Sequence, residues 1–170
     1  LQAKLGETVG EFGGKVKILP VKSVGVQGDE RTYKHPAVVY GKPFPWDEIR
    51  MFATLLTNQF PDINRVLYGL FPDQFELLTI QNRYLTKERV LTTQKADKVV
   101  MDYINEIGVD RDIWQFPTVL MPLSVGGVEG ESIVLRPVCS QEAMTASFYE
   151  MDMEKLAELV KRLKAIEGIS

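Results

Sequence analysis

The sequence contains a single cysteine, Cys139, and a single histidine, His35, among its 170 residues. One cysteine excludes an intramolecular disulfide framework, and we expect Cys139 to be a buried structural thiol in a strand. The usual zinc sites need several Cys or His ligands, so we expect no metal site. A Cys-His nucleophile pair would require His35 and Cys139 to meet in the fold.

Long apolar runs and an excess of positive charge are also missing. No apolar stretch approaches the ~20 residues that a membrane-spanning helix needs, and the formal net charge is −3. A nucleic-acid-binding protein would normally carry a basic face, so we expect neither a nucleic acid nor a membrane as partner. The chain begins at Leu1 without a signal-peptide pattern, and we interpret it as the middle of a longer, cytoplasmic protein.

Familiar phosphate-binding loops are absent as well, because the sequence has no Walker A motif and no G-x-G-x-x-G motif. Residues 124–129 (S-V-G-G-V-E) superficially resemble the S-G-G-x-D-S loop of ATP pyrophosphatases, but the serine is separated from the glycines and the Asp-Ser is missing. We therefore expect a β-hairpin connection there. The carboxylates of Glu150, Asp152 and Glu154 are expected to begin the last helix, where the helix dipole favours negative charge.

The most informative feature of the sequence is an internal repeat. Residues 20–29 (P-V-K-S-V-G-V-Q-G-D) align without a gap with residues 122–131 (P-L-S-V-G-G-V-E-G-E). Each copy lies between two strand-like apolar runs and continues into a helix with apolar residues at steps of three and four. The runs are 16–19 and 37–40, then 118–121 and 133–136. The helical positions are Ile49, Phe52, Ala53, Leu56 and Phe60, then Leu156, Leu159, Val160, Leu163 and Ile166.

The repeat predicts an α+β fold of two tandem β-β-α-β units, with small sheets, helices packed on one face and a connector helix between the units. Residues 1–91 would form the first subdomain, including an irregular surface excursion at 71–87. Residues 92–170 would form the connector helix and the second subdomain. Because a strand at 62–68 follows the first helix, we expect a strand to follow Ser170, which would leave the second unit truncated in this chain.

The connector helix is predicted to be capped by Thr92 or Thr93 and to end at Gly108. Gln94 and Lys95 would then lie in its first turn, where free N–H groups and the helix dipole favour an anion. A solvated first turn is the alternative. The predicted apolar stripe comprises Ala96, Val99, Val100, Tyr103, Ile104 and Ile107.

The stretch from Gln27 to Tyr33 (Q-G-D-E-R-T-Y) begins in the repeated loop and then departs from the second copy. The additional Arg31, Thr32 and Tyr33 indicate a role beyond folding. Arginine offers a planar fork of donors suited to phosphate, threonine adds a hydroxyl, and tyrosine can stack on a base. By composition alone, a solvated hairpin is the alternative.

These stretches together resemble the C-terminal region of GMP synthases. The resemblance covers nearly the whole chain in order, and the two β-β-α-β units are similar to the longer form of the enzyme, in which an extra copy is inserted into the dimerisation region. The matching stretches are 16–33 (V-K-I-L-P-V-K-S-V-G-V-Q-G-D-E-R-T-Y), 63–68 (I-N-R-V-L-Y), 94–97 (Q-K-A-D), 133–138 (I-V-L-R-P-V), 143–146 (A-M-T-A) and 167–170 (E-G-I-S).

The resemblance implies a two-part reaction in the complete enzyme. An ATP pyrophosphatase domain uses ATP and magnesium to adenylylate xanthosine monophosphate (XMP), and ammonia released by a glutaminase domain or subunit then gives GMP. The C-terminal region would hold the XMP phosphate, form a homodimer and need no cofactor of its own. We expect it to be inactive alone, because the S-G-G-x-D-S loop and the glutaminase Cys-His-Glu triad are missing from the sequence.

The resemblance also implies roles for individual residues. Arg31 matches the arginine of the family's Q-G-D-x-R-[ST]-Y motif, so we expect it to contact the XMP phosphate. Gln94 stands where the family often has arginine, and it could still donate a hydrogen bond beside Lys95. The supporting loop would comprise Gln27, Gly28, Asp29 and Tyr33. Residues expected to serve the fold and the dimer contact are Arg136, Met144 and Thr145.

One family motif does not occur in this chain. The family ends in a K-P-P-x-T-x-E-W-E tail whose lysine and glutamate help to grip XMP, and the sequence stops at Ser170 before it. We therefore expect weak XMP binding by the isolated chain. The alternative function is a non-catalytic dimer that senses a nucleotide or metabolite.

Overall fold

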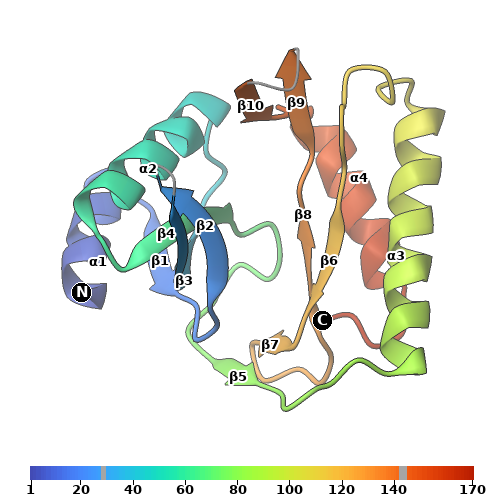
Figure 1. Ribbon diagram of the computed structural model, residues 1–170, viewed down its shortest axis with the longest axis horizontal. Helices are drawn as coiled ribbons and strands as arrows, with labels where there is room; N and C mark the ends of the chain where they lie inside the picture. The colour runs from blue at the N-terminus through green and yellow to red at the C-terminus, as the bar shows by residue number, and fades with distance from the viewer. Residues whose placement is uncertain (28–29, 142–144) are drawn as a thin grey trace. The chain divides into compact units, whose positions relative to one another are not determined.

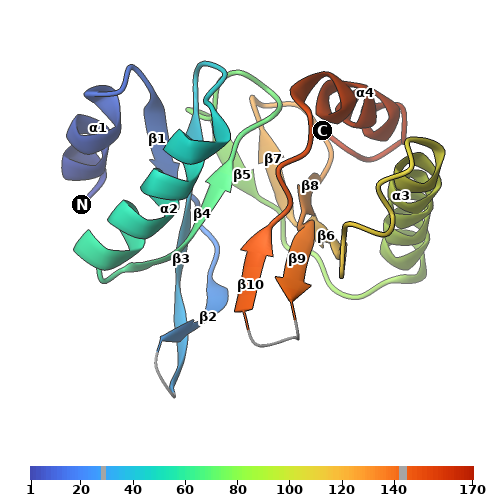
Figure 2. The same ribbon diagram turned by 90° about the horizontal axis from the view of Figure 1, so that it is seen from above.

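The computed structural model describes residues 1–27, 30–141 and 145–170, and these form an α+β fold as predicted (Figures 1 and 2). The chain divides into two compact units. Unit 1 comprises Leu1–Ile80 with Val125–Gly127, and unit 2 comprises Gln81–Ser124 with Val128–Ser170. None of the helices in the described ranges is both long and apolar enough to cross a membrane.

Unit 1 is built around the long strand β3. Its elements are α1 (Gln2–Gly10), β1 (Lys15–Ile18), β2 (Ser23–Gln27), β3 (Glu30–Tyr40), α2 (Trp46–Gln59), β4 (Ile63–Tyr68) and β5 (Leu78–Ile80). Strands β1 and β2 pair antiparallel with β3, whereas β4 pairs parallel with it. A parallel neighbour requires a crossover connection, and α2 provides it.

The continuously apolar run at 37–40 forms the buried second half of β3. All four residues are at most 4% exposed, because the strand is covered on both faces. Phe44 and Phe52 supply aromatic packing in this core, with ring centroids 5.4 Å apart. Phe75 packs against Tyr40, so the predicted surface excursion at 71–87 contributes a buried residue to the core.

The described residues of unit 2 form two small sheets of the unit's own and two long helices. Its elements are α3 (Lys87–Glu106), β6 (Thr118–Met121), β7 (Leu123–Val125, whose last residue belongs to unit 1), β8 (Ser132–Leu135), β9 (Val138–Gln141), β10 (Thr145–Phe148) and α4 (Met153–Lys164). Strand β6 pairs antiparallel with β8, and β9 pairs antiparallel with β10. Helix α3 packs against both β6 and α4 (Figure 1).

The predicted start of the connector helix is wrong. Helix α3 begins at Lys87, and the side chain of Thr86, not of Thr92 or Thr93, accepts the capping hydrogen bond, from the Arg89 N–H. The first turns of α3 leave Val90 and Leu91 exposed, so the apolar periodicity begins only where the helix becomes covered. Its buried positions, Ala96, Val100, Tyr103 and Ile104, lie on the predicted stripe. The predicted Gly108 adopts a positive φ of 70° just beyond the helix end.

The finer tandem β-β-α-β arrangement is not confirmed. Strand β2 adds a third strand before α2, and the β9–β10 pair intervenes between β8 and α4. One correspondence is clear: Ile63 pairs in parallel with His35, and Ile169 forms a parallel bridge with Glu131. In both units the chain a few residues after the helix therefore runs parallel to an earlier segment, which is β3 in unit 1 and the residue before β8 in unit 2. The subdomain boundary expected at 91/92 falls inside α3.

Candidate functional site

Strands β2 and β3 form a hairpin that exposes Arg31 and Tyr33 on one face. Because neighbouring residues on a strand point to opposite faces, these two side chains share a face and lie about 7 Å apart along β3. Both are exposed, Tyr33 by 65%. Val24 pairs with Tyr33 across the hairpin and is 44% exposed on the same face. This face therefore offers a guanidinium beside an aromatic ring and an aliphatic side chain.

The opposite face of the hairpin packs against the start of β4. Asn64 Nδ2 donates to the Ser23 carbonyl oxygen at 2.8 Å, and Asn64 Oδ1 accepts from the Ser23 hydroxyl at 2.6 Å. The guanidinium of Arg65 donates from Nη2 to the Val24 carbonyl oxygen at 3.0 Å. The I-N-R stretch belongs to one of the matching sequence motifs, but no role was predicted for Asn64 or Arg65. Two polar residues at the start of an apolar strand could have indicated that they bond a neighbouring segment.

The predicted supporting loop lies only partly within the described residues. Gln27 is the last residue of β2, and its backbone pairs with Glu30 of β3. Gly28 and Asp29 lie outside the described residues, as does Met144. A solvated hairpin was the alternative interpretation of the Gln27–Tyr33 stretch, and its described residues lie in the paired strands β2 and β3.

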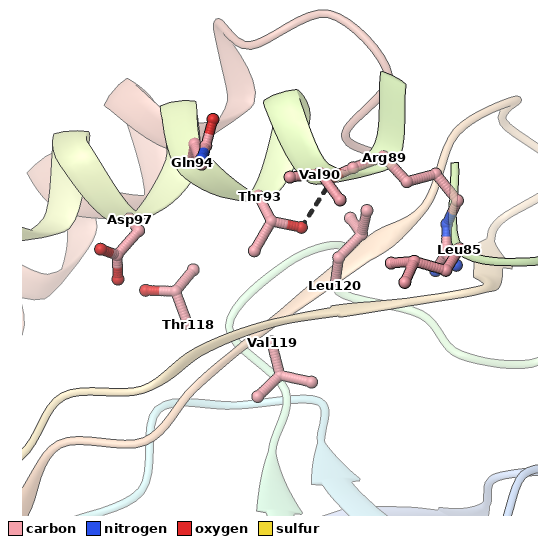
Figure 3. Close-up of a pocket in the computed structure, with 9 residues that line it drawn as sticks. All are labelled: Leu85, Arg89, Val90, Thr93, Gln94, Asp97, Thr118, Val119 and Leu120. Atoms are coloured by element: carbon pink, nitrogen blue, oxygen red, sulfur yellow. Dashed lines mark hydrogen bonds between the residues drawn. The ribbon is translucent and has the colours of Figure 1, made fainter. Parts of the chain in front are cut away.

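Gln94 lies on a groove between α3 and β6 in unit 2, with a volume of about 470 Å³ (Figure 3). Gln94 shares one face of α3 with Val90, Thr93 and Asp97, as the spacing of three and four residues requires. Lys95 is one residue further, about 100° around the helix, and does not line the groove. The lining residues are Leu85, Arg89, Val90, Thr93, Gln94, Asp97, Thr118, Val119 and Leu120.

The groove differs chemically from the anion site that the sequence suggested. Because α3 begins at Lys87, Gln94 and Lys95 lie about two turns inside the helix, where backbone N–H groups are already bonded. The prediction that they lie in the first turn is therefore wrong. Asp97 adds a carboxylate to the groove, and the Thr118 Oγ1 atom is buried without a hydrogen-bond partner among the described residues. A neutral donor-bearing group fits this lining better than a bare anion.

Arg89 and Glu131 form the most buried ion pair among the described residues of unit 2. Their side chains are 20% and 10% exposed, and Arg89 Nη2 lies 2.9 Å from Glu131 Oε1 while Arg89 Nε lies 3.0 Å from Oε2. Arg89 also donates to the Tyr84 carbonyl oxygen. The backbone N–H of Glu131 donates to the Gly168 carbonyl oxygen at 2.8 Å, and the Ser170 N–H donates to the Glu131 carbonyl oxygen at 3.0 Å. The pair therefore links the start of α3 to the last residues of the chain.

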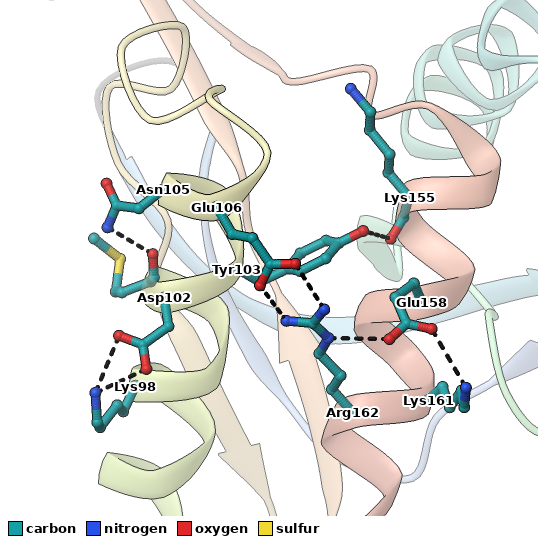
Figure 4. A network of polar contacts seen from close by, with 10 residues as sticks. Lys98, Asp102, Tyr103, Asn105, Glu106, Lys155, Glu158, Lys161 and Arg162 are labelled. Carbon is teal, nitrogen blue, oxygen red and sulfur yellow. Dashed lines mark hydrogen bonds and ion pairs between the residues drawn. The ribbon is translucent and has the colours of Figure 1, made fainter.

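A second polar cluster links the far ends of α3 and α4 (Figure 4). Arg162 donates to both carboxylate oxygens of Glu106 and, through Nε, to Glu158. Its guanidinium also lies over the Tyr103 ring, whose hydroxyl donates to the Lys155 carbonyl oxygen. Hydrogen bonds from Arg162 lower the pKa of Glu106 and of Glu158 below the ordinary carboxylate value. This arrangement holds the two helices together.

The remaining candidate side chains have structural partners. Asp152 was expected at the start of the last helix, and it caps α4 by accepting from the N–H groups of Glu154 and Lys155. Cys139 lies in β9, is half-buried, and donates to the Asp112 carbonyl oxygen; burial, and then Asp112, raises the pKa of its thiol. His35 Nδ1 lies 3.0 Å from the Leu19 carbonyl oxygen. No group of His, Cys, Asp and Glu suited to a metal ion occurs among the residues that the structure describes.

Comparisons with known proteins agree with the resemblance noted from the motifs. The family described as GMP synthase C terminal domain matches residues 102–170. A probable glutamine-hydrolyzing GMP synthase of Leptospira interrogans is 41% identical over 146 residues, which is 84% of this chain and 24% of the relative. Its counterpart in Caenorhabditis elegans is 29% identical over 90% of this chain and 24% of its own length. The Bifidobacterium longum GMP synthase is 40% identical over 46% of this chain and 16% of its own length.

We predict that Arg89→Met destabilises unit 2 by about 3 kcal/mol, because it leaves the Glu131 carboxylate buried and unpaired. Adding Glu131→Leu should recover part of this loss, since the double variant buries no unpaired charge. The free energy of unfolding of the single and the double variant is measured by urea denaturation, with the fluorescence of Trp114 as the signal in a Trp46→Phe background. The control is Lys98→Met, which breaks an exposed pair with Asp102 and should cost under about 0.5 kcal/mol. Equal losses for Arg89→Met and Lys98→Met would contradict the prediction.

We also predict an acid-sensitive contribution from the Arg162 cluster. Because the folded-state pKa values of Glu106 and Glu158 are lowered, their stabilising effect is complete above the unfolded carboxylate pKa of about 4.3 and is lost as the pH falls through the folded values. The stability difference between the unsubstituted chain and Arg162→Met should therefore shrink between neutral pH and about pH 3. The exposed Arg111→Met serves as control, and a difference that stays constant with pH for Arg162→Met would refute the assignment.

Proposed function

Since this chain belongs to the GMP synthase family, through the C-terminal domain match at residues 102–170 and relatives aligned over most of its length, we propose that it holds the phosphate of XMP in such an enzyme. The chain spans about a quarter of the length of the curated relatives that it matches over most of its own length, 24% in each case. The activity of the whole enzyme is therefore part of the proposal.

The observation that carries the proposal is the placement of Arg31. Its guanidinium is exposed on the outer face of the β2–β3 hairpin, two residues from the exposed Tyr33. A guanidinium fork can donate two parallel hydrogen bonds to a phosphate, and a tyrosine ring can pack against a ribose or base. In the described parts, Arg31 is more accessible for a ligand than Arg89 or Arg162, each of which is already bonded to carboxylates.

Gln94 and Lys95 have secondary roles in this proposal. Gln94 is one of the residues that line the groove beside α3, and its amide can donate one hydrogen bond to a nucleotide oxygen. The Asp97 carboxylate in the same groove opposes a phosphate there, so Gln94 suits a neutral oxygen of the ligand better. Lys95 is exposed on a neighbouring face of α3 and would contribute through its long side chain and its charge. The supporting residues are Gln27, Gly28, Asp29 and Tyr33.

The chemical steps would occur outside this region. The sequence contains neither an S-G-G-x-D-S loop nor a glutaminase triad, so in this proposal ATP, magnesium and glutamine-derived ammonia act elsewhere in a cytoplasmic ligase. The residues described here would bind and orient XMP. Remote binding of the phosphate contributes to catalysis by fixing the reacting purine in place.

We predict that Arg31→Ala, made in the complete GMP synthase chain, weakens XMP binding by about 1.5–3 kcal/mol, or about 10- to 150-fold. Arg31→Lys should recover part of the loss, because it restores the charge without the bidentate geometry. The Kd for XMP is measured by isothermal titration calorimetry and the KM for ATP by enzyme kinetics. The KM for ATP should be unchanged. The exposed Lys22→Ala controls for a general loss of positive charge. Unchanged XMP affinity in Arg31→Ala would remove Arg31 from the site.

We further propose that the region associates as a homodimer. Exposed apolar side chains motivate this, notably Tyr84 and Leu85, which are 73% and 86% exposed, because adjacent exposed apolar groups often mark association surfaces. Sedimentation equilibrium of the chain at micromolar concentration should give twice the monomer mass of 19.2 kDa. A monomer at every concentration tested would eliminate self-association by this region.

A further inference from the structure

Asn64 connects three strands of unit 1 through one side chain. It lies at the start of β4 and exchanges two hydrogen bonds with Ser23 of β2. Its Nδ2 also lies 3.4 Å from the carbonyl oxygen of Thr32 in β3. Thr32 is the immediate neighbour of Arg31, so the same amide contacts the backbone that carries the guanidinium.

Gly25 of β2 lies so close to the Asn64 side chain that a larger residue would clash there. A Cβ atom at position 25 would lie only 2.9 Å from both Cβ and Nδ2 of Asn64. Real Cβ atoms do not approach other atoms so closely, because dispersion attraction gives way to steep repulsion at that range. Gly25 pairs with Thr32 across the hairpin, so the amide of Asn64 lies directly against this pair.

The hairpin needs such an anchor. Its strand β2 pairs with residues 30–34 of β3, whereas β1 pairs with residues 37–40. A two-stranded hairpin is only marginally stable by itself in water. The contacts of Asn64 and Arg65 with β2 hold one face of the hairpin against β4, and Arg31 and Tyr33 consequently occupy the other face.

We infer that Asn64 is a positioning residue: by bonding Ser23 and Thr32, it determines how the β2–β3 hairpin presents Arg31 to the nucleotide phosphate. This inference rests on the proposed function of Arg31. Asn64 itself does not touch the ligand. Its effect on binding should therefore pass entirely through Arg31, and this separates it from a residue that only stabilises the fold.

The test is a double-mutant cycle in the complete GMP synthase chain. Asn64→Ala should raise the Kd and KM for XMP about 2- to 12-fold, the size of effect expected for the loss of one hydrogen bond, with kcat at saturating XMP and the KM for ATP unchanged. In the Arg31→Ala background, Asn64→Ala should have no further effect on XMP binding. The exposed Asn58→Ala on α2 is the matched control.

Two further variants guard against a trivial loss of folding. Gly25→Ala places a methyl group against Asn64 and should reproduce the XMP defect of Asn64→Ala. Asn64→Asp keeps the size and the acceptor but loses the donated bonds, so it should remain defective. Thermal unfolding identifies any variant that is simply unfolded at the assay temperature.

The possible results separate the two ideas. If Arg31→Ala leaves XMP binding unchanged, the proposed function of Arg31 fails, and the positioning role fails with it. If Arg31→Ala weakens XMP binding while Asn64→Ala and Gly25→Ala do not, only the positioning role is overturned. The positioning role is also overturned if Asn64→Ala weakens XMP binding equally in the Arg31→Ala background, or weakens ATP binding to the same extent.

Discussion

The pairing of β3 on its two edges is the constraint on which unit 1 depends. Its second half, residues 37–40, is buried between β1 and β4, and its first half continues into the hairpin with β2. Pro36, which lacks an N–H, follows a register shift at His35, where a missing donor is tolerated. One strand thus joins a rigid core to the exposed segment that carries Arg31. A surface arginine on such a strand is better preorganised for a ligand than one on a mobile loop.

Unit 2 uses charged side chains to join elements that the sequence separates. The Arg89–Glu131 pair connects the first turn of α3 to the backbone that bridges with Ile169. The Arg162 cluster connects the other end of α3 to α4. The Arg89–Glu131 pair is mostly buried, so breaking it leaves an unpaired charge that destabilises the fold. The Arg162 cluster is more exposed, so its contribution to stability varies with pH and salt. Helix α3 is therefore held at both ends by different kinds of ion pair.

The internal repeat illustrates how similar segments acquire different roles. Gly25 packs against Asn64, whereas its repeat partner Gly127 adopts a positive φ of 72° in a turn. The two glycines occupy equivalent positions in the two copies but meet different physical demands: close approach in one and backbone conformation in the other. The β-β-α-β description captured the α+β class but did not account for β2, β9 and β10.

Local patterns in the sequence determined the elements that bury one face. The spacing of Ile49, Phe52 and Leu56 predicted α2, the spacing of Leu156, Leu159 and Leu163 predicted α4, and Asp152 was predictable as a cap, because these signals arise within one or two helical turns. The motifs also singled out Arg31. Only the tertiary structure decided that α3 begins at Lys87, that Arg89 meets Glu131 and that Asn64 bonds Ser23. Exposed helical turns lack the periodic apolar residues by which a helix is predicted. Hydrogen-bond partners that lie 41 or 42 residues apart are brought together only by the fold, so no local sequence pattern indicates them.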